Sequence, residues 1–189
     1  MPNVYSGPMW RLPSRLLLFL VCAAMPAGAA ENPSHALDLI KPNRQQPARD
    51  FKVVALDGGR LNLAELKGKV VFLNLWATWC GPCKEEMPAM ERLWQRFKGD
   101  GLVVIALSMD SGGAKVVKPY IDQAKYTYPI GLDPKMEIAQ LYGAYSVPST
   151  YIIDRSGALR AIALGPRAWD GRASFAFFDA LLKDGKPRG

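Results

Sequence analysis

The chain has 189 residues, of which 49% are hydrophobic and 22% charged, and its formal net charge at pH 7 is +7. This length fits one domain with extra segments at its ends, and it suffices to bury a core without disulfide staples. The lysines and arginines are scattered, and no basic run is interleaved with aromatic residues. We therefore interpret the positive charge as a solvated surface and predict no nucleic-acid partner.

The first 30 residues match an export signal. They contain no Asp or Glu, and Arg11 and Arg15 precede an apolar run at residues 16–24, after which come a proline and four small residues. That order is typical of a secretory signal, and the apolar run is shorter than the roughly 20 residues that cross a bilayer. We predict a cleaved signal peptide over residues 1–30 and a periplasmic protein. An uncleaved leader would instead anchor the protein in the inner membrane, and a disordered cytosolic leader is the remaining alternative.

The cysteine count points to chemistry rather than to a disulfide scaffold. Cys22 falls in the predicted signal, and Val21 before it is a poor match to the small residue that precedes a lipidated cysteine, so we expect Cys22 to be lost with the signal. Cys80 and Cys83 remain, three positions apart. A disulfide that closes so short a loop constrains the unfolded chain only modestly.

The folded domain is predicted over residues 48–189. Residues 31–47 are rich in Asn, Ser, Pro and Gln, which indicates a linker or an ordered tail. A strand at 51–56, a hairpin turn at Asp57-Gly58-Gly59 and a short strand at 61–63 predict an N-terminal β-hairpin.

Strands and helices then alternate. The near-continuous apolar run at 69–76 is typical of a central strand buried on both faces, and apolar residues at three- and four-residue spacing predict a helix from Pro82 to Phe97. The same patterns predict a strand at 102–107, a helix at 114–125 disturbed near Pro119, a helix at 134–142, strands at 149–153 and 158–164, and a helix at 175–183. We therefore predict an α/β fold with a mixed central sheet flanked by helices.

Cys80 and Cys83 lie where the central strand gives way to a helix. Unpaired N–H groups at a helix N-terminus stabilise negative charge, so a thiol there has a lowered pKa. Cys80 is expected at or just before the first helical residue, with Cys83 one turn later on the same face. This spacing predicts thiol–disulfide exchange, in which Cys80 attacks a partner's disulfide and Cys83 resolves the mixed disulfide.

Half of a zinc site is the competing interpretation of the two cysteines. Such a site needs about two more Cys or His ligands. The single histidine, His35, lies in the predicted linker, and the only other cysteine lies in the predicted signal. A copper-delivery site of two cysteines and a distant histidine is excluded for the same reason, because the predicted domain contains no histidine. We therefore predict no metal and no cofactor.

Residues 71–88 resemble the TlpA/ResA-like branch of the thioredoxin superfamily, and so do Gly68-Lys69-Val70 and Val147-Pro148-Ser149-Thr150. The likeness extends from about Pro47 to Ala180. It implies a thioredoxin fold with an N-terminal β-hairpin extension and a central insertion, within residues 126–142. It further implies an exported, often membrane-tethered reductant. The clients of this branch are exported disulfide-containing proteins such as apocytochromes c or copper-centre assembly proteins, and its electrons come from a membrane thiol carrier.

The resemblance also assigns roles to single residues. It makes Cys80 the attacking thiol and Cys83 the resolving thiol. Pro148 matches the family's cis-proline beside the disulfide, which leaves the backbone polar groups of Val147 free for an extended client segment. Glu86 matches a buried acid that tunes the cysteines and moves protons, although a solvated helix-face acid is the alternative.

Three further features refine this site. Asn74 stands where thioredoxins carry a buried Asp. An amide cannot accept a proton at neutral pH, so Glu86 becomes the stronger candidate for the group that moves protons at this site. Trp79 is predicted to shape the client surface, whereas core packing is equally compatible with Trp76. Residues 126–142 either contribute client selectivity or simply cover the surface.

Two other functions compete with disulfide reduction. A thiol peroxidase on the same fold would carry a Pro-x-x-x-Thr-x-x-Cys pattern, which is absent around Cys80. A non-catalytic binding or assembly module is the other alternative, and it would not depend on Cys80.

Overall fold

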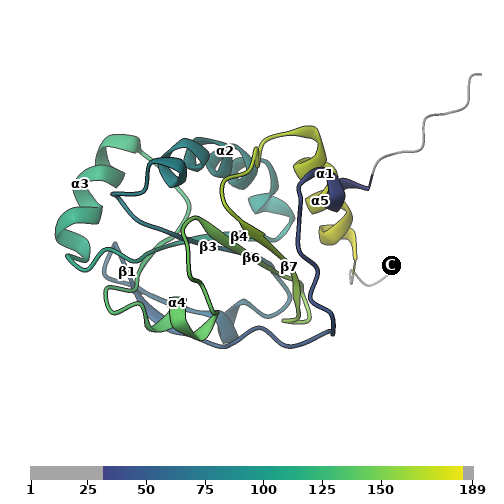
Figure 1. The fold of residues 1–189 in the computed structure, drawn as a ribbon, viewed down its shortest axis with the longest axis horizontal. Coiled ribbons are helices and arrows are strands. Elements are labelled where there is room, and N and C mark those ends of the chain that lie inside the picture. Colours follow the sequence, from purple (N-terminus) through teal and green to yellow (C-terminus); the bar gives the residue numbers. More distant parts are fainter. Residues whose placement is uncertain (1–31, 185–189) are drawn as a thin grey trace, which may run out of the picture. The chain divides into compact units, whose positions relative to one another are not determined.

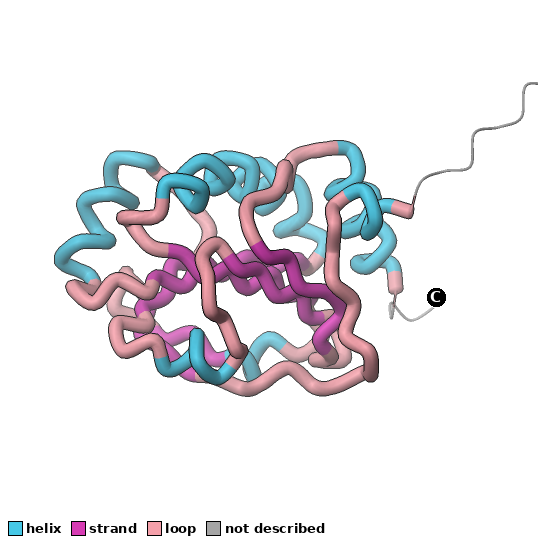
Figure 2. Tube along the Cα trace, viewed as in Figure 1, coloured by secondary structure: helices cyan, strands magenta, loops and turns pink. Residues whose placement is uncertain are grey.

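The computed structural model describes residues 32–184, so the predicted signal peptide and Cys22 lie outside the described residues. Seven strands form one mixed sheet in the order β2-β1-β5-β4-β3-β6-β7. Helices lie on both faces of this sheet, as Figure 2 shows. The predicted mixed sheet with flanking helices is therefore confirmed.

Strand β3 (Val70–Trp76) is the centre of the sheet. It pairs in parallel with β4 (Leu102–Ser108) and antiparallel with β6 (Ser149–Ile153). All seven of its residues are buried, as expected for a strand with covered faces. Strand β7 (Leu159–Leu164) continues the sheet as the antiparallel partner of β6.

The N-terminal hairpin joins the sheet through a strand that the sequence did not predict. Strands β1 (Lys52–Ala55) and β2 (Arg60–Asn62) pair antiparallel, and β5 (Ile130–Leu132) lies between β1 and β4. Strand β5 has three residues with a glycine in the middle, which gives little strand signal. A Cβ atom at Gly131 would come within 2.8 Å of the Leu107 side chain, so tight packing explains the glycine.

Two helical layers cover the sheet (Figure 1). Helices α2 (Gly81–Phe97), α3 (Ala114–Ala124) and α5 (Arg172–Lys183) pack on one face, which buries Met87, Val117 and Phe178 in one core cluster. The other face is covered by α4 (Glu137–Leu141) and the 3₁₀ helix η1 (Leu63–Leu66). The 3₁₀ helix η2 (Lys98–Asp100) follows α2. Strand β5 and helix α4 both fall in the predicted insertion.

Helix α3 continues through Pro119 as one helix, so the proline does not break it. Val117 and Ile121 are buried on either side of the proline and hold the helix against the sheet. Pro119 has no N–H to donate to the Lys115 carbonyl. Both residues are exposed, so water can donate a hydrogen bond to that carbonyl instead.

The segment before the hairpin is ordered along one edge of the fold. The short helix α1 (Pro33–Ala36) contacts α5, and Ile40 forms a β-bridge with Ile162 of β7. Pro47 forms a second bridge with Ala158. The two ends of the stretch predicted as a linker or ordered tail therefore pack against α5 and the β6–β7 hairpin, while residues 43–46 between them are exposed. None of the helices within residues 32–184 is long and apolar enough to cross a membrane.

Candidate active site

Cys80 and Cys83 form a disulfide at the start of α2. Cys80 is the N-cap residue, where the sequence placed it, and the Cys83 N–H donates to Cys80 Sγ at 3.2 Å. Cys83 is fully buried and Cys80 is 6% exposed, so Cys80 is the cysteine that a partner can reach.

A buried carboxylate that sequence reasoning missed fixes the loop before Cys80. Asp110 follows β4 and is 4% exposed. Its two oxygens accept hydrogen bonds from the Thr78 N–H (2.9 Å) and hydroxyl (2.6 Å), and Ser108 donates to it at 2.8 Å. The end of β4 thus holds the loop that carries Cys80. The only signal in the sequence for the contact between Asp110 and Thr78 is that an acidic residue follows a predicted buried strand.

The two tryptophans near the disulfide have different environments. Trp79 is 68% exposed directly before Cys80, which suits the predicted client surface. Trp76 is fully buried, and its ring lies 5.5 Å from that of Tyr120, so the core-packing interpretation holds for Trp76.

The Val147–Pro148 peptide bond is cis, as the resemblance implied. Ser149 pairs with Leu75 near the end of β3, so Pro148 lies at the end of the sheet from which the Cys80 loop departs. The Pro148 carbonyl accepts from the Gly165 N–H at 2.9 Å. Within residues 32–184 neither backbone polar group of Val147 is hydrogen-bonded, so both are available to an extended partner.

Glu86 lies on α2 one turn beyond Cys83 and is 3% exposed, which excludes the solvated alternative. Its Oε1 accepts from Asn74 Nδ2 at 2.9 Å. Its Oε2 accepts from the Arg167 N–H at 3.0 Å and from Trp169 Nε1 at 2.9 Å. Burial raises the pKa of Glu86 from 4.5 to about 7, against the opposing effect of these donors and of the Arg167 charge. A carboxyl with this pKa exchanges protons near neutral pH.

The hydrogen-bond partners of Glu86 come from β3 and from the loop after β7. Asn74 donates to Thr150 Oγ1 at 3.0 Å as well as to Glu86, and the two residues lie opposite each other in the β3–β6 register. Trp169 is fully buried in the loop between β7 and α5, where its indole N–H needs a partner. Nothing in the sequence around Arg167 or Trp169 signals that they would meet an acid on α2.

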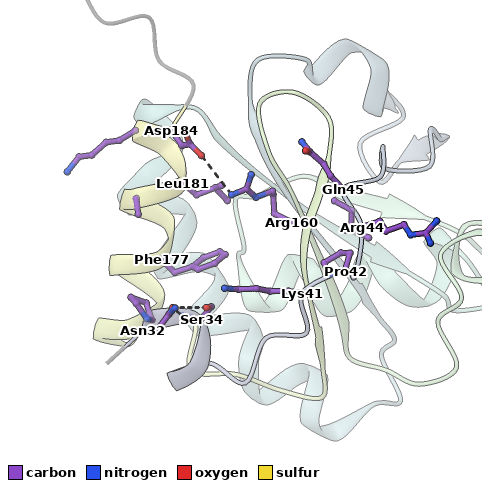
Figure 3. A pocket seen from close by; sticks show the side chains of 14 residues that line it. Asn32, Ser34, Lys41, Pro42, Arg44, Gln45, Arg160, Phe177, Leu181 and Asp184 are labelled. Carbon is purple, nitrogen blue, oxygen red and sulfur yellow. Dashed lines mark hydrogen bonds and ion pairs between the residues drawn. The ribbon is translucent and has the colours of Figure 1, made fainter. Parts of the chain in front are cut away.

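A pocket of about 780 Å³ lies away from this site, between α5, β7 and the segment before the hairpin. In Figure 3, Lys41 and Phe177 point into it from opposite sides, and Arg160 faces Asp184. Leu159 at the start of β7 pairs with Ile153, which pairs with Val71 at the start of β3. The pocket therefore lies near the opposite end of the sheet from the disulfide.

Comparisons with known proteins agree with this geometry. The AhpC/TSA family profile matches residues 45–162. The thiol-disulfide oxidoreductase ResA of Oceanobacillus iheyensis is 35% identical over 159 residues, covering 83% of this chain and 82% of that protein. ResA of Bacillus thuringiensis is 39% identical over 110 residues, covering 58% of this chain and 63% of the relative, so that match spans less than two thirds of the relative's length.

A solved structure extends the likeness to three dimensions. A thiol:disulfide interchange protein of the thioredoxin family from Chlorobium tepidum superimposes with a TM-score of 0.61 at 29% identity, covering 75% of this chain and 99% of that one. The predicted thioredoxin fold is thereby confirmed. The chain belongs to the AhpC/TSA family, and within it to the ResA/TlpA-like oxidoreductases of the thioredoxin superfamily.

Proposed function

We propose that this chain is a thiol–disulfide oxidoreductase that reduces disulfides in other exported proteins through Cys80 and Cys83. The position of Cys80 carries the proposal: it caps α2, and the Cys83 N–H donates to its sulfur. The same donor and the helix N-terminus stabilise the Cys80 thiolate once the disulfide is reduced. A thiolate is the species that attacks a disulfide.

The reaction proceeds in two exchanges. The Cys80 thiolate attacks one sulfur of the client disulfide, a Cys80–client bond forms, and the second client sulfur leaves as a thiolate. Cys83 then loses its proton and attacks Cys80 Sγ, which releases the first client sulfur and forms the Cys80–Cys83 disulfide. The client gains two electrons, and the cysteine pair loses them. Glu86, one turn from Cys83, accepts the Cys83 proton in this scheme.

The client approaches as an extended segment. Among residues 32–184 the N–H and carbonyl of Val147 have no hydrogen-bond partner, which supports pairing with a client backbone next to Pro148, and the exposed Trp79 supports an apolar contact beside Cys80. Exposed aromatic side chains of this kind bury large areas at interfaces.

The location and partners follow from the leader and the family resemblance. We infer a periplasmic protein whose clients are apocytochromes c or copper-centre assembly proteins and whose electrons come from a membrane thiol carrier. Intact-mass measurement of the exported protein should show a chain that begins after residue 29 or 30. A mature protein that retained residues 16–22 would instead support the membrane-tethered form.

Insulin reduction driven by dithiothreitol tests the activity. The wild-type chain should accelerate the reaction, and Cys80→Ser should abolish the acceleration because no thiolate remains to attack. Cys22→Ser in the full chain is the matched control and should keep the wild-type rate. A Cys80→Ser chain with full function in cells would favour the binding module, and rapid peroxide consumption by the wild type would favour the peroxidase.

Trapping identifies the clients. Cys83→Ser leaves the mixed disulfide unresolved, so clients should accumulate covalently bound to Cys80. Mass spectrometry of these adducts should recover exported proteins with paired cysteines, and the absence of any adduct contradicts direct exchange.

A further inference from the structure

We propose that Arg167 is a positioning residue, clamped by the backbone of residues 37–38, that holds two hydrogen-bond donors on Glu86. The proposal rests on the proposed function because Glu86 matters for exchange only if the cysteines react. It makes the segment at residues 32–40, far from the disulfide in sequence, part of the proton-handling site.

The Arg167 guanidinium is enclosed by carbonyl groups. Its Nε donates to the Leu37 carbonyl at 2.7 Å and its Nη2 to the Asp38 carbonyl at 3.2 Å. Its Nη1 donates to the carbonyls of Leu164 (3.1 Å) and Pro166 (2.9 Å). The side chain is 17% exposed and also lies 3.2 Å from the Asp38 carboxylate. The planar, multi-donor group of arginine suits such a set of acceptors, whereas a lysine ammonium cannot reach them all.

The same residue reaches Glu86 through its backbone. The Arg167 N–H donates to Glu86 Oε2 at 3.0 Å, and Trp169 Nε1 donates to the same oxygen at 2.9 Å. A 3.0 Å hydrogen bond from the Trp169 N–H to the Arg167 carbonyl closes this short turn. The guanidinium therefore fixes the turn from outside, and the turn places both donors on one carboxylate oxygen.

The residues that anchor Arg167 are themselves docked. Leu37 is 5% exposed, α1 packs on α5, and Ile40 pairs with Ile162 through two hydrogen bonds of 2.8 and 2.9 Å. Undocking this segment would remove the Leu37 and Asp38 carbonyls from Arg167 without touching Glu86 directly.

The electrostatic surroundings of Glu86 give the direction of the effect. Against the larger effect of burial, which raises the pKa of Glu86, the Arg167 N–H, the Trp169 indole and the Asn74 amide lower it, and the Arg167 charge adds a smaller effect in the same direction. Asn74 of β3 donates to Glu86 at 2.9 Å, and the same amide donates to Thr150 of β6 at 3.0 Å, so both strands contribute only neutral groups here. The Tyr128 phenol also interacts with Glu86, and burial raises the pKa of that phenol well above its usual range. The Asp170 carboxylate, in the same loop as Arg167, pairs with Arg92 at 2.6 Å.

The test measures the Glu86 carboxyl directly. In full-length chain labelled with ¹³C at Glu Cδ, the Glu86 resonance is assigned by its loss in Glu86→Gln and is titrated from pH 4 to pH 9 in the oxidised protein. Arg167→Ala should raise the midpoint by about half a pH unit or more, because a nearby charge and well-held donors favour the ionised form. Arg167→Lys should fall between Arg167→Ala and wild type.

Two more variants separate positioning from general destabilisation. Leu37→Gln puts a polar group at a buried contact and should raise the midpoint with Arg167 intact. Arg92→Ala removes an ion pair to the same loop and should leave the midpoint unchanged. If Arg167→Ala fails to fold, Arg167→Lys and Leu37→Gln still decide the matter.

The outcomes separate this inference from the proposed function. An unchanged midpoint in folded Arg167→Lys and Leu37→Gln overturns the positioning role. A shifted midpoint combined with unimpaired insulin reduction by Glu86→Gln at every pH supports the positioning role while removing Glu86 from the exchange reaction.

Discussion

Replacing Glu86 with glutamine should change how the stability of the protein depends on pH. Burial raises the pKa of Glu86 from 4.5 to about 7, so between these values the folded state binds a proton that the unfolded state releases. The unfolding free energy therefore falls as pH rises through this window. Each pH unit between the two values is worth about 1.4 kcal/mol, so the ionised carboxylate should cost the folded state roughly 3 kcal/mol above pH 7.

Glutamine occupies nearly the same volume but does not ionise, so Glu86→Gln removes this pH-dependent cost. Its amide group meets the donors on Glu86 imperfectly, which adds an offset that does not depend on pH. The stability of Glu86→Gln relative to wild type should therefore rise by roughly 3 kcal/mol between pH 4.5 and pH 8.

Urea unfolding of the oxidised proteins at half-unit pH steps measures this difference, and titration of other groups cancels in the comparison. Glu85→Gln is the matched control because Glu85 is the exposed neighbour on the same helix and makes none of the Glu86 contacts. A wild-type-to-Glu86→Gln difference that stays constant within about 0.5 kcal/mol from pH 4.5 to pH 8 would refute the reasoning.

Other variants probe separate parts of the fold and site. Asp133→Ala leaves the N–H groups of residues 137–139 without their carboxylate partner, so urea unfolding should show a loss of about 2 kcal/mol. Gly131→Ala should lower the unfolding free energy by about 1 to 3 kcal/mol because its Cβ would meet Leu107 at 2.8 Å, and a thermal melt as stable as the wild type would contradict this packing. Trp79→Ala should lower kcat/KM for a protein disulfide several-fold while changing stability by less than about 0.5 kcal/mol, because the ring is exposed.

The sequence predicts the elements that depend on local pattern. The buried run of β3, the helical spacing of α2 and the terminal hairpin appear in the structure close to their predicted positions. Strand β5 was missed because three residues around a glycine carry no periodicity, and its existence depends on pairing with β1 and β4. Helix α3 continues through Pro119 because burial of the flanking residues outweighs the loss of one hydrogen bond.

In the site, too, the sequence predicts the residues that local spacing places and misses those that tertiary contacts place. Cys80 caps α2, and Cys83 and Glu86 follow it at three-residue intervals, so a helix beginning after Cys80 already places them on neighbouring turns. The groups that donate hydrogen bonds to Glu86 are 81 and 83 residues away along the chain, except for Asn74. They meet Glu86 only through the β3–β6 register and the turn after β7, which no local pattern encodes.

This division has a mechanistic consequence. The sulfur chemistry depends on contacts within the first turns of α2, whereas the affinity of Glu86 for its proton depends on tertiary contacts with the strands and with the turn that Arg167 holds. Substitutions in those tertiary contacts should therefore move the pH profile of exchange while leaving the Cys80–Cys83 geometry in place. Substitutions at the start of α2 should act on the exchange rate at every pH.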